Sequence, residues 1–283
     1  MHTKYVYCIA TLLTLCFAQF CAAQNPLFPE APGVVSYTYR NQLAKDLPGT
    51  LDTIKSLGIV DMEFSNLFGK TASEIRALLD ERGMYCSSFG VSYDDLRNRL
   101  NEVTSNAKTL GASYVRVAWL PSRQPFTLEL AQKTAEEFNE IGKRLRLEFG
   151  LTFCYHNHGY EFVPYQDGTL FDALVAQTNP QDVSFELDVL WAFFPGADPA
   201  AIIDRHGDRI KLLHLKDLRK GVKGDLTGKT AVENDVALGT GQLDIPAIVR
   251  AAKKAGVKHF YIEDESPSIA TQVPESIAFL KSL

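Results

Sequence analysis

The segment Arg146-Leu-Glu-Phe-Gly-Leu-Thr-Phe-Cys-Tyr-His156 shows the unit from which this chain is built: the end of a helix, a glycine, and an apolar run typical of a buried strand. Glycine suits this place because helices often end in the left-handed conformation, where a side chain would clash. The unit recurs at Ile54–Glu63, Leu78–Phe89, Ala107–Val117 and Ala252–Glu263. Helices and strands that alternate through short turns predict parallel strands joined by right-handed crossovers.

Eight strands are predicted in this way, at Gly33–Tyr37, Ile59–Phe64, Met84–Phe89, Ser113–Val117, Leu151–His156, Val183–Asp188, Arg209–His214 and Val257–Glu263. The helices between and after them are predicted at Thr50–Leu57, Thr71–Arg82, Tyr93–Leu110, Thr127–Phe149, Thr169–Gln177, Pro199–His206, Ile245–Ala255 and Pro274–Leu280. Such a count suits a (β/α)8 barrel. An open doubly wound sheet is the alternative, but no glycine-rich dinucleotide motif follows the first strand. We therefore predict a single (β/α)8 TIM barrel.

The N-terminal residues have the features of a targeting segment. Lys4 precedes the apolar stretch Tyr5–Phe20, and Cys21-Ala-Ala23 supplies the small residues typical of a cleavage site. The stretch is too short and poorly flanked for a good transmembrane span. We predict a cleaved signal peptide at residues 1–23, a barrel domain at residues 24–283, and export to the periplasm or the extracellular space. A lipoprotein signal is the less favoured alternative, because no cysteine here follows a convincing small residue.

Charge and cysteine content limit the kinds of partner that the chain is expected to bind. The chain has 29 Lys and Arg against 34 Asp and Glu, and loss of residues 1–23 changes its net charge from −5 to −6. A mildly acidic chain without a basic run does not indicate binding to nucleic acid or to an anionic membrane. Only Cys86 and Cys154 remain after cleavage, so no disulfide framework is expected. A small-molecule partner is favoured, and a homo-oligomer is left open.

Four predicted strands end on residues that bind metals. These are His156, Asp188, His214 and Glu263. The carboxyl ends of all strands of a parallel barrel meet at one mouth, so we predict one divalent-metal site there. Nitrogen and oxygen donors suit Mn, Zn, Co, Fe or Mg and do not select among them. Each residue also has a simpler interpretation, as a hydrogen-bonded histidine, a helix-capping aspartate or an ion-paired glutamate, but four such coincidences on successive strands are improbable.

Neighbouring residues extend this candidate site. His158 has the parity of His156 on its strand, and Lys216 has that of His214, so both are expected to face the mouth. Glu63 ends the second strand and is either a substrate contact or a salt-bridge partner within the barrel. Glu161 is either catalytic or bonded to loop backbone. Trp119 and Trp191 follow strand ends, where they either stack on a sugar or pack in the core.

At this point the chain resembles the sugar phosphate isomerase/epimerase family, the xylose-isomerase-like TIM barrels. The matching segments are Tyr155-His-Asn-His-Gly-Tyr-Glu-Phe162, Phe185-Glu-Leu-Asp-Val-Leu-Trp191, Leu213-His-Leu-Lys-Asp217, Leu238-Gly-Thr-Gly-Gln242 and Tyr261-Ile-Glu263. The resemblance implies one divalent metal ion bound by His156, Asp188, His214 and Glu263. It also implies a carbohydrate substrate, a keto sugar or polyol derivative, that binds beside the metal.

One departure from the family affects the expected reaction. Ketose 3-epimerases of this family have a glutamate at the place of His156 and use it with the last-strand glutamate, here Glu263, as paired bases. Epimerisation by this chain therefore requires a substitute base, with His158, Glu161 and Lys216 as candidates. The segment His156-Asn-His also resembles inosose-dehydratase-like and glycoside-lyase-like members, which need a single base.

Three functions follow as alternatives. The first is an isomerase or epimerase that acts on a keto sugar through a metal-stabilised enediolate. The second is a lyase or dehydratase that cleaves 3-keto-glycosides or keto-polyols by β-elimination. The third is a noncatalytic sugar-binding barrel. Export favours an unphosphorylated substrate, and the irregular segment Leu218–Gln242, after the seventh strand, is predicted to form a lid over the mouth.

Overall fold

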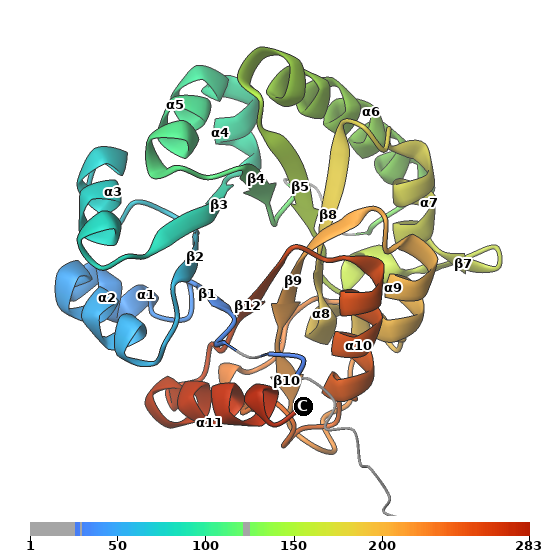
Figure 1. The fold of residues 1–283 in the computed structure, drawn as a ribbon. Helices are drawn as coiled ribbons and strands as arrows, with labels where there is room; N and C mark the ends of the chain where they lie inside the picture. Colours follow the sequence, from blue (N-terminus) through green and yellow to red (C-terminus); the bar gives the residue numbers. More distant parts are fainter. Residues whose placement is uncertain (1–25, 29, 121–124) are drawn as a thin grey trace, which may run out of the picture.

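The computed structural model describes residues 26–28, 30–120 and 125–283. The predicted signal peptide, residues 1–23, lies outside these residues. Eight parallel strands form a closed barrel in the order β1-β12-β9-β8-β5-β4-β3-β2, which confirms the predicted (β/α)8 fold (Figure 1). The strands are β1 (Gly33–Val35), β2 (Asp61–Phe64), β3 (Tyr85–Val91), β4 (Tyr114–Val117), β5 (Thr152–His156), β8 (Val183–Asp188), β9 (Ile210–Leu215) and β12 (His259–Ile262).

Helices surround the barrel as an outer ring (Figure 1). They are α1 (Arg40–Lys45), α2 (Leu47–Ser56), α3 (Ala72–Glu81), α4 (Tyr93–Asn98), α5 (Leu100–Leu110), α6 (Leu128–Arg144), α7 (Leu170–Gln177), α8 (Val189–Phe193), α9 (Pro199–His206), α10 (Ile245–Ala255) and α11 (Ile269–Lys281). Gly111, Gly150 and Gly256 end helical segments with positive φ angles of 86°, 69° and 79°, as the repeated unit predicts. No helix among the described residues is long and apolar enough to cross a membrane.

Several helix predictions need correction, and the short helices α1 and α8 were not predicted. The predicted helix Tyr93–Leu110 is two helices, because the backbone of Arg99 leaves the helical region at φ −131°. The last helix begins at Ile269 rather than at Pro274, and Pro274 lies inside it. Helix α1 was not predicted at all, because its short sequence contains a single buried residue, Leu43, and hence no apolar period.

Apolar side chains fill the space between the barrel and its helices, in one continuous core. A smaller cluster of Cys154, Leu212 and Tyr261 is also buried. Loops at the carboxyl ends of the strands form two antiparallel pairs, β6 (Pro164–Tyr165) with β7 (Gly168–Thr169), and β10 (Asp217–Leu218) with β11 (Asp235–Val236). The second pair ties part of the segment Leu218–Gln242 to the end of β9.

Candidate metal centre and cavity

The four predicted ligands meet at the carboxyl end of the barrel. Their strands β5, β8, β9 and β12 are consecutive neighbours, and Asp188 pairs directly with His214 in the sheet register. One donor atom from each of His156, Asp188, His214 and Glu263 lies within 4.8 Å of all the others. All four side chains are buried or nearly so.

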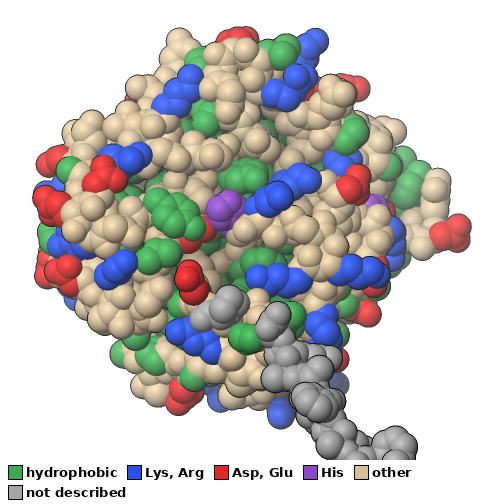
Figure 2. Space-filling model, viewed as in Figure 1, with side chains coloured by type: hydrophobic (Ala, Val, Ile, Leu, Met, Phe, Trp, Pro, Cys, Tyr) green, Lys and Arg blue, Asp and Glu red, His purple; other side chains and the backbone are tan. Residues whose placement is uncertain are grey.

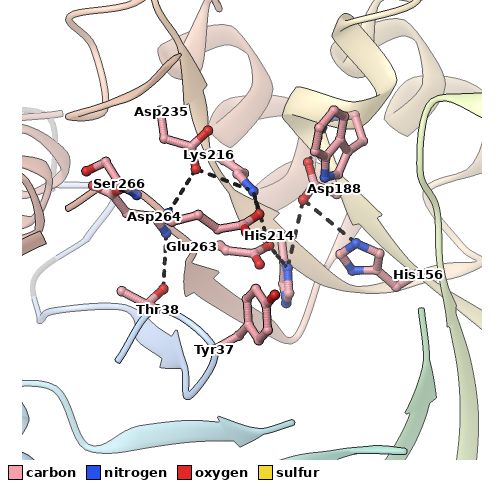
Figure 3. Close-up of polar contacts among 12 residues, drawn as sticks. Tyr37, Thr38, His156, Asp188, His214, Lys216, Asp235, Glu263, Asp264 and Ser266 are labelled. Carbon is pink, nitrogen blue, oxygen red and sulfur yellow. Dashed lines mark hydrogen bonds and ion pairs between the residues drawn. The ribbon is translucent and has the colours of Figure 1, made fainter. Parts of the chain in front are cut away.

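The contacts inside this cluster leave one oxygen unsatisfied. Asp188 Oδ1 accepts the backbone N–H of Trp191 at 2.9 Å and so caps α8, as its simpler interpretation foresaw. Its other oxygen, Oδ2, lies 3.8 Å from His156 Nε2 and 4.0 Å from His214 Nδ1, and has no hydrogen-bond partner among the described residues (Figure 3). A buried carboxylate oxygen without a partner is costly. A cation in the middle of the cluster would satisfy it, so the residues fit a divalent metal ion.

A second layer of charges lies beneath the cluster. His214 Nε2 is 3.0 Å from Glu63 Oε1, and His156 Nδ1 is 3.1 Å from Glu186 Oε2. Arg116 forms ion pairs with both glutamates, with its Nε 3.1 Å from Glu63 Oε1 and 3.2 Å from Glu186 Oε2. Such partners fix the orientation of ligating imidazoles. One guanidinium thus forms ion pairs with two buried carboxylates.

Burial and charge set the protonation of the histidines. Burial lowers the pKa of His156 well below its usual range, so the ring is neutral and has a lone pair available for a cation. Burial acts the same way on His214, but Glu186 and Glu263 outweigh it and raise that pKa well above its usual range. His214 therefore holds a proton in the absence of metal, and metal binding would displace that proton.

Lys216 and Glu263 form the charged edge of the cluster. Lys216 Nζ lies 2.6 Å from Glu265, 3.5 Å from Asp235 on β11 and 4.0 Å from Glu263. Burial opposes a charge on Lys216, but these carboxylates outweigh it and raise its pKa well above the usual range. Burial likewise raises the pKa of Glu263, but Lys216 and His214 outweigh it and bring that pKa well below the usual range. The lysine is thus a fixed cation, which suits holding Glu263 and does not suit accepting a proton.

Two predicted residues lie away from the cavity and are corrected here. The Glu161 carboxylate accepts the hydroxyl of Tyr155 at 2.5 Å and the backbone N–H of His158 at 3.0 Å, and burial raises its pKa to about 8. Glu63 is fully buried against Arg116 and accepts the hydroxyl of Ser88 at 2.6 Å. Neither is among the described residues that line the cavity, so direct contact of either with a substrate is not supported.

His158, Trp119 and Trp191 line the cavity. Lys216 is not among the described residues that line it, so its predicted direct contact with a substrate is not supported either. His158 lies against Trp119, with ring centroids 3.6 Å apart, and its Nδ1 has no hydrogen-bond partner among the described residues. Burial lowers the pKa of His158 well below its usual range, so its ring is neutral. Trp191 is mostly buried under the Lys216 ammonium, at 5.3 Å, and also reaches the cavity.

The cavity itself has a volume of about 470 Å³ and opens at the carboxyl end of the barrel. Figure 2 shows a histidine near the centre of the face seen in Figure 1, with hydrophobic side chains around it. Sequence reasoning missed several residues of this region, among them Tyr37, Arg116, Glu186 and Glu265. A signal existed for two of them, because Arg116 and Glu186 are charged residues inside otherwise apolar strands.

The fold and the site together define a (β/α)8 barrel with a buried cluster of candidate metal ligands at its mouth. Residues 51–283 match the family model described as xylose isomerase-like TIM barrel, and the chain therefore belongs to this family of enzymes. The resemblance inferred from the sequence motifs is thereby confirmed.

One curated relative and two solved structures are similar to the chain. Inosose dehydratase of Geobacillus kaustophilus (strain HTA426) is 27% identical over 232 residues, which cover 71% of this chain and 74% of that protein. A sugar phosphate isomerase/epimerase from Parabacteroides distasonis ATCC 8503 has the same fold, with a TM-score of 0.73, 22% identity and coverage of 93% of this chain and 98% of that one. IolI, solved with a bound zinc atom, aligns with a TM-score of 0.68, 16% identity and coverage of 89% and 95%.

Proposed function

We propose that this protein is a divalent-metal-dependent lyase that eliminates water or an alcohol from a neutral keto sugar or keto-polyol. The observation that supports this most directly is the buried, unpartnered Asp188 Oδ2 among two histidines and a glutamate. The named activity of the Geobacillus relative, a dehydratase, agrees with an elimination.

His156, Asp188, His214 and Glu263 would hold the metal ion. The bound ion would act as a Lewis acid on the carbonyl oxygen and on the negative charge that develops when the neighbouring carbon loses a proton. Glu63 and Glu186 hold the two imidazoles from behind, and Arg116 forms ion pairs with both of these carboxylates. The donors are thus oriented before any substrate binds. The metal's identity is left open among Mn, Zn, Co, Fe and Mg.

Proton transfer is assigned to His158. Its ring lines the cavity, is neutral, and has an unpartnered Nδ1, whereas Glu263 is engaged by His214 at 2.8 Å. A neutral imidazole takes the proton from the carbon beside the carbonyl, and the resulting imidazolium returns it to the oxygen that leaves from the next carbon. A carbon–carbon double bond forms as the carbon–oxygen bond breaks, and no oxidant or reductant is consumed.

The cavity favours a substrate without a phosphate group. Among the described residues that line it, Asp94, Glu263 and Glu265 are acidic, and Arg116 is the only lysine or arginine. Arg116 already forms ion pairs with two glutamates. Among the described lining residues, no unengaged guanidinium or ammonium is therefore available as a phosphate clamp. An exported protein, as residues 1–23 predict, would also meet sugars that lack phosphate.

Isomerisation or epimerisation remains the second candidate, because it begins with the same proton removal. It needs proton transfer at a second position. Glu263 is the carboxylate of the cluster that also lines the cavity, so it is the candidate for this second transfer. The third candidate, a noncatalytic sugar-binding barrel, would not require a complete ligand set.

The test is incubation of the metal-loaded protein with a 3-keto-glucoside and with an inosose in D2O, followed by NMR. Release of the aglycone or of water, with an unsaturated ketone as the second product, supports the lyase. Deuterium uptake with an inverted centre or a shifted carbonyl would replace it with the isomerase or epimerase. No exchange with any keto sugar would favour the binding barrel.

A further inference from the structure

The cavity extends beyond the candidate metal centre onto the opposite half of the barrel. The four candidate ligands come from β5, β8, β9 and β12, which are consecutive strands. Much of the remaining lining follows β1, β2, β3 and β4, which are consecutive as well, and includes Tyr37, Val91, Tyr93, Trp119 and Leu120. The cavity is therefore built in two halves, and the four candidate ligands come from one of them.

Its size exceeds what one sugar ring requires. A cyclic hexose has twelve non-hydrogen atoms, and at roughly 15 Å³ per atom in a close-packed site it fills roughly 180 Å³. The cavity of about 470 Å³ is more than twice as large. A single ring placed against the metal ligands would leave the other half to solvent.

That other half presents aromatic rings to the solvent. Tyr37 is 39% exposed and Trp119 is 40% exposed, although large aromatic side chains are mostly buried elsewhere in the described chain. Both rings are supported by neighbours, since the Arg40 guanidinium lies over Tyr37 at 4.2 Å and His158 lies against Trp119. Figure 3 draws Tyr37 together with His214 and Glu263, and all three residues line the cavity. Supported, exposed aromatic rings in a cavity are typical of ring-stacking sites.

We infer that the half of the cavity formed by Tyr37, Tyr93, Trp119 and Leu120 is a subsite for a second ring attached to the keto sugar, so that the substrate is a glycoside. This inference rests on the proposed function, which places the keto sugar at the metal-binding half. The leaving group of the elimination is then the ring-bearing alcohol. An aromatic aglycone and a second sugar both present a flat apolar face, and the experiment distinguishes them.

Tryptophan fluorescence provides a direct readout, because the two tryptophans of the chain, Trp119 and Trp191, both line the cavity. The metal-loaded protein is titrated with methyl β-glucoside, phenyl β-glucoside and cellobiose. None of these sugars has a ketone, so the proposed elimination does not occur and the titration reaches equilibrium. We expect phenyl β-glucoside or cellobiose, or both, to bind at least about fivefold tighter than methyl β-glucoside, since aromatic stacking contributes about this much. The tighter of the two identifies the kind of second ring.

Substitutions test whether the difference in affinity arises at this half of the cavity. Tyr37→Ala should reduce the affinity ratio to below about twofold while both fluorescent reporters remain. Tyr85→Ala is the matched control, because Tyr85 is 49% exposed but begins β3, at the amino end of the barrel, and does not line the cavity. Equal affinities for all three sugars would overturn the subsite. A ratio that persists in both Tyr37→Ala and Trp119→Ala would also overturn it.

Failure of the subsite is distinguishable from failure of the lyase proposal. If the affinity ratio holds but no keto sugar is turned over, the second-ring subsite stands and the chemistry is wrong. If elimination occurs but the three sugars bind equally, the chemistry stands and the subsite is wrong.

Discussion

At the amino end of the barrel Asp61 and His259 are hydrogen-bonded at 2.6 Å, whereas at the carboxyl end Asp188 and His214 come no closer than 4.0 Å. The Asp61 carboxylate also accepts the hydroxyl of Ser87, which in turn is 2.6 Å from the Tyr261 hydroxyl. Both oxygens of Asp61 are thus satisfied, while Asp188 Oδ2 is not. Buried polar groups that have hydrogen-bond partners stabilise a fold. An unpaired buried polar group has a free-energy cost, which the binding of a partner removes. The same residue types therefore serve structure at one end and, under the proposed function, metal binding at the other.

The largest effect should follow from removing one metal ligand at the carboxyl end. His214→Ala or Glu263→Gln should lower kcat by about 10³-fold or more, because loss of a ligand removes the Lewis acid from the reaction. Metal content measured by elemental analysis should fall in parallel, with an unchanged far-ultraviolet circular dichroism spectrum. Full turnover in a chelator-treated protein would contradict the metal-dependent mechanism.

A smaller loss should follow from replacing the proposed proton-transfer residue. His158→Gln should reduce kcat by about 10²- to 10⁴-fold, the usual contribution of a positioned acid or base. Bound metal should stay near the wild-type amount, because His158 is not one of the clustered ligands. If metal content and activity fell together in His158→Gln, the residue would belong to the metal site instead.

The amino end should respond in the opposite way. Asp61→Asn should lower the free energy of unfolding by about 1–3 kcal/mol, because it disrupts the hydrogen bonds to His259 and Ser87. Activity per folded molecule should stay close to wild type. Denaturant titration and kinetics on the same sample measure the free energy of unfolding and the activity. A loss of kcat without a loss of stability would contradict the structural role of the amino end.

The last prediction concerns stability rather than turnover and involves Glu161, whose carboxyl group accepts the backbone N–H of His158. Its pKa is raised from 4.5 to about 8 by burial, so the folded state favours the protonated form. A raised pKa contributes stability that is present below the unfolded value and is lost as pH rises through the folded value. The free energy of unfolding should therefore decline between about pH 4.5 and 8, by at most about 1.4 kcal/mol per pH unit.

Glu161→Gln provides the comparison, since an amide of the same size does not titrate. The variant should lack this part of the pH dependence, as measured by denaturant titrations at several pH values. Parallel stability curves for wild type and variant would show that the pKa of Glu161 is the same in the folded and the unfolded protein, which would contradict the raised pKa.

Much of the fold was predictable because the information is local. A glycine that ends a helix and an apolar run that follows it are set by backbone sterics and burial within a few residues, so all eight strands and most of the surrounding helices were predicted. Boundaries failed where a single residue decides them, as at Arg99, which separates α4 from α5. The convergence of the four ligands followed from the same logic, since topology brings parallel strand ends together.

The sequence by itself determined the barrel and the residues at its mouth. Only the tertiary structure decided which of their neighbours face the cavity. The sheet register shifts at Met62/Glu63 and again at Phe185/Glu186, so strict alternation along these strands does not give the orientation of Glu63 and Glu186. The turn Tyr160–Phe162 buries Glu161 against Tyr155. Strand alternation is a local property, whereas pairing across a bulge depends on the partner strand, which the chain meets only when it folds.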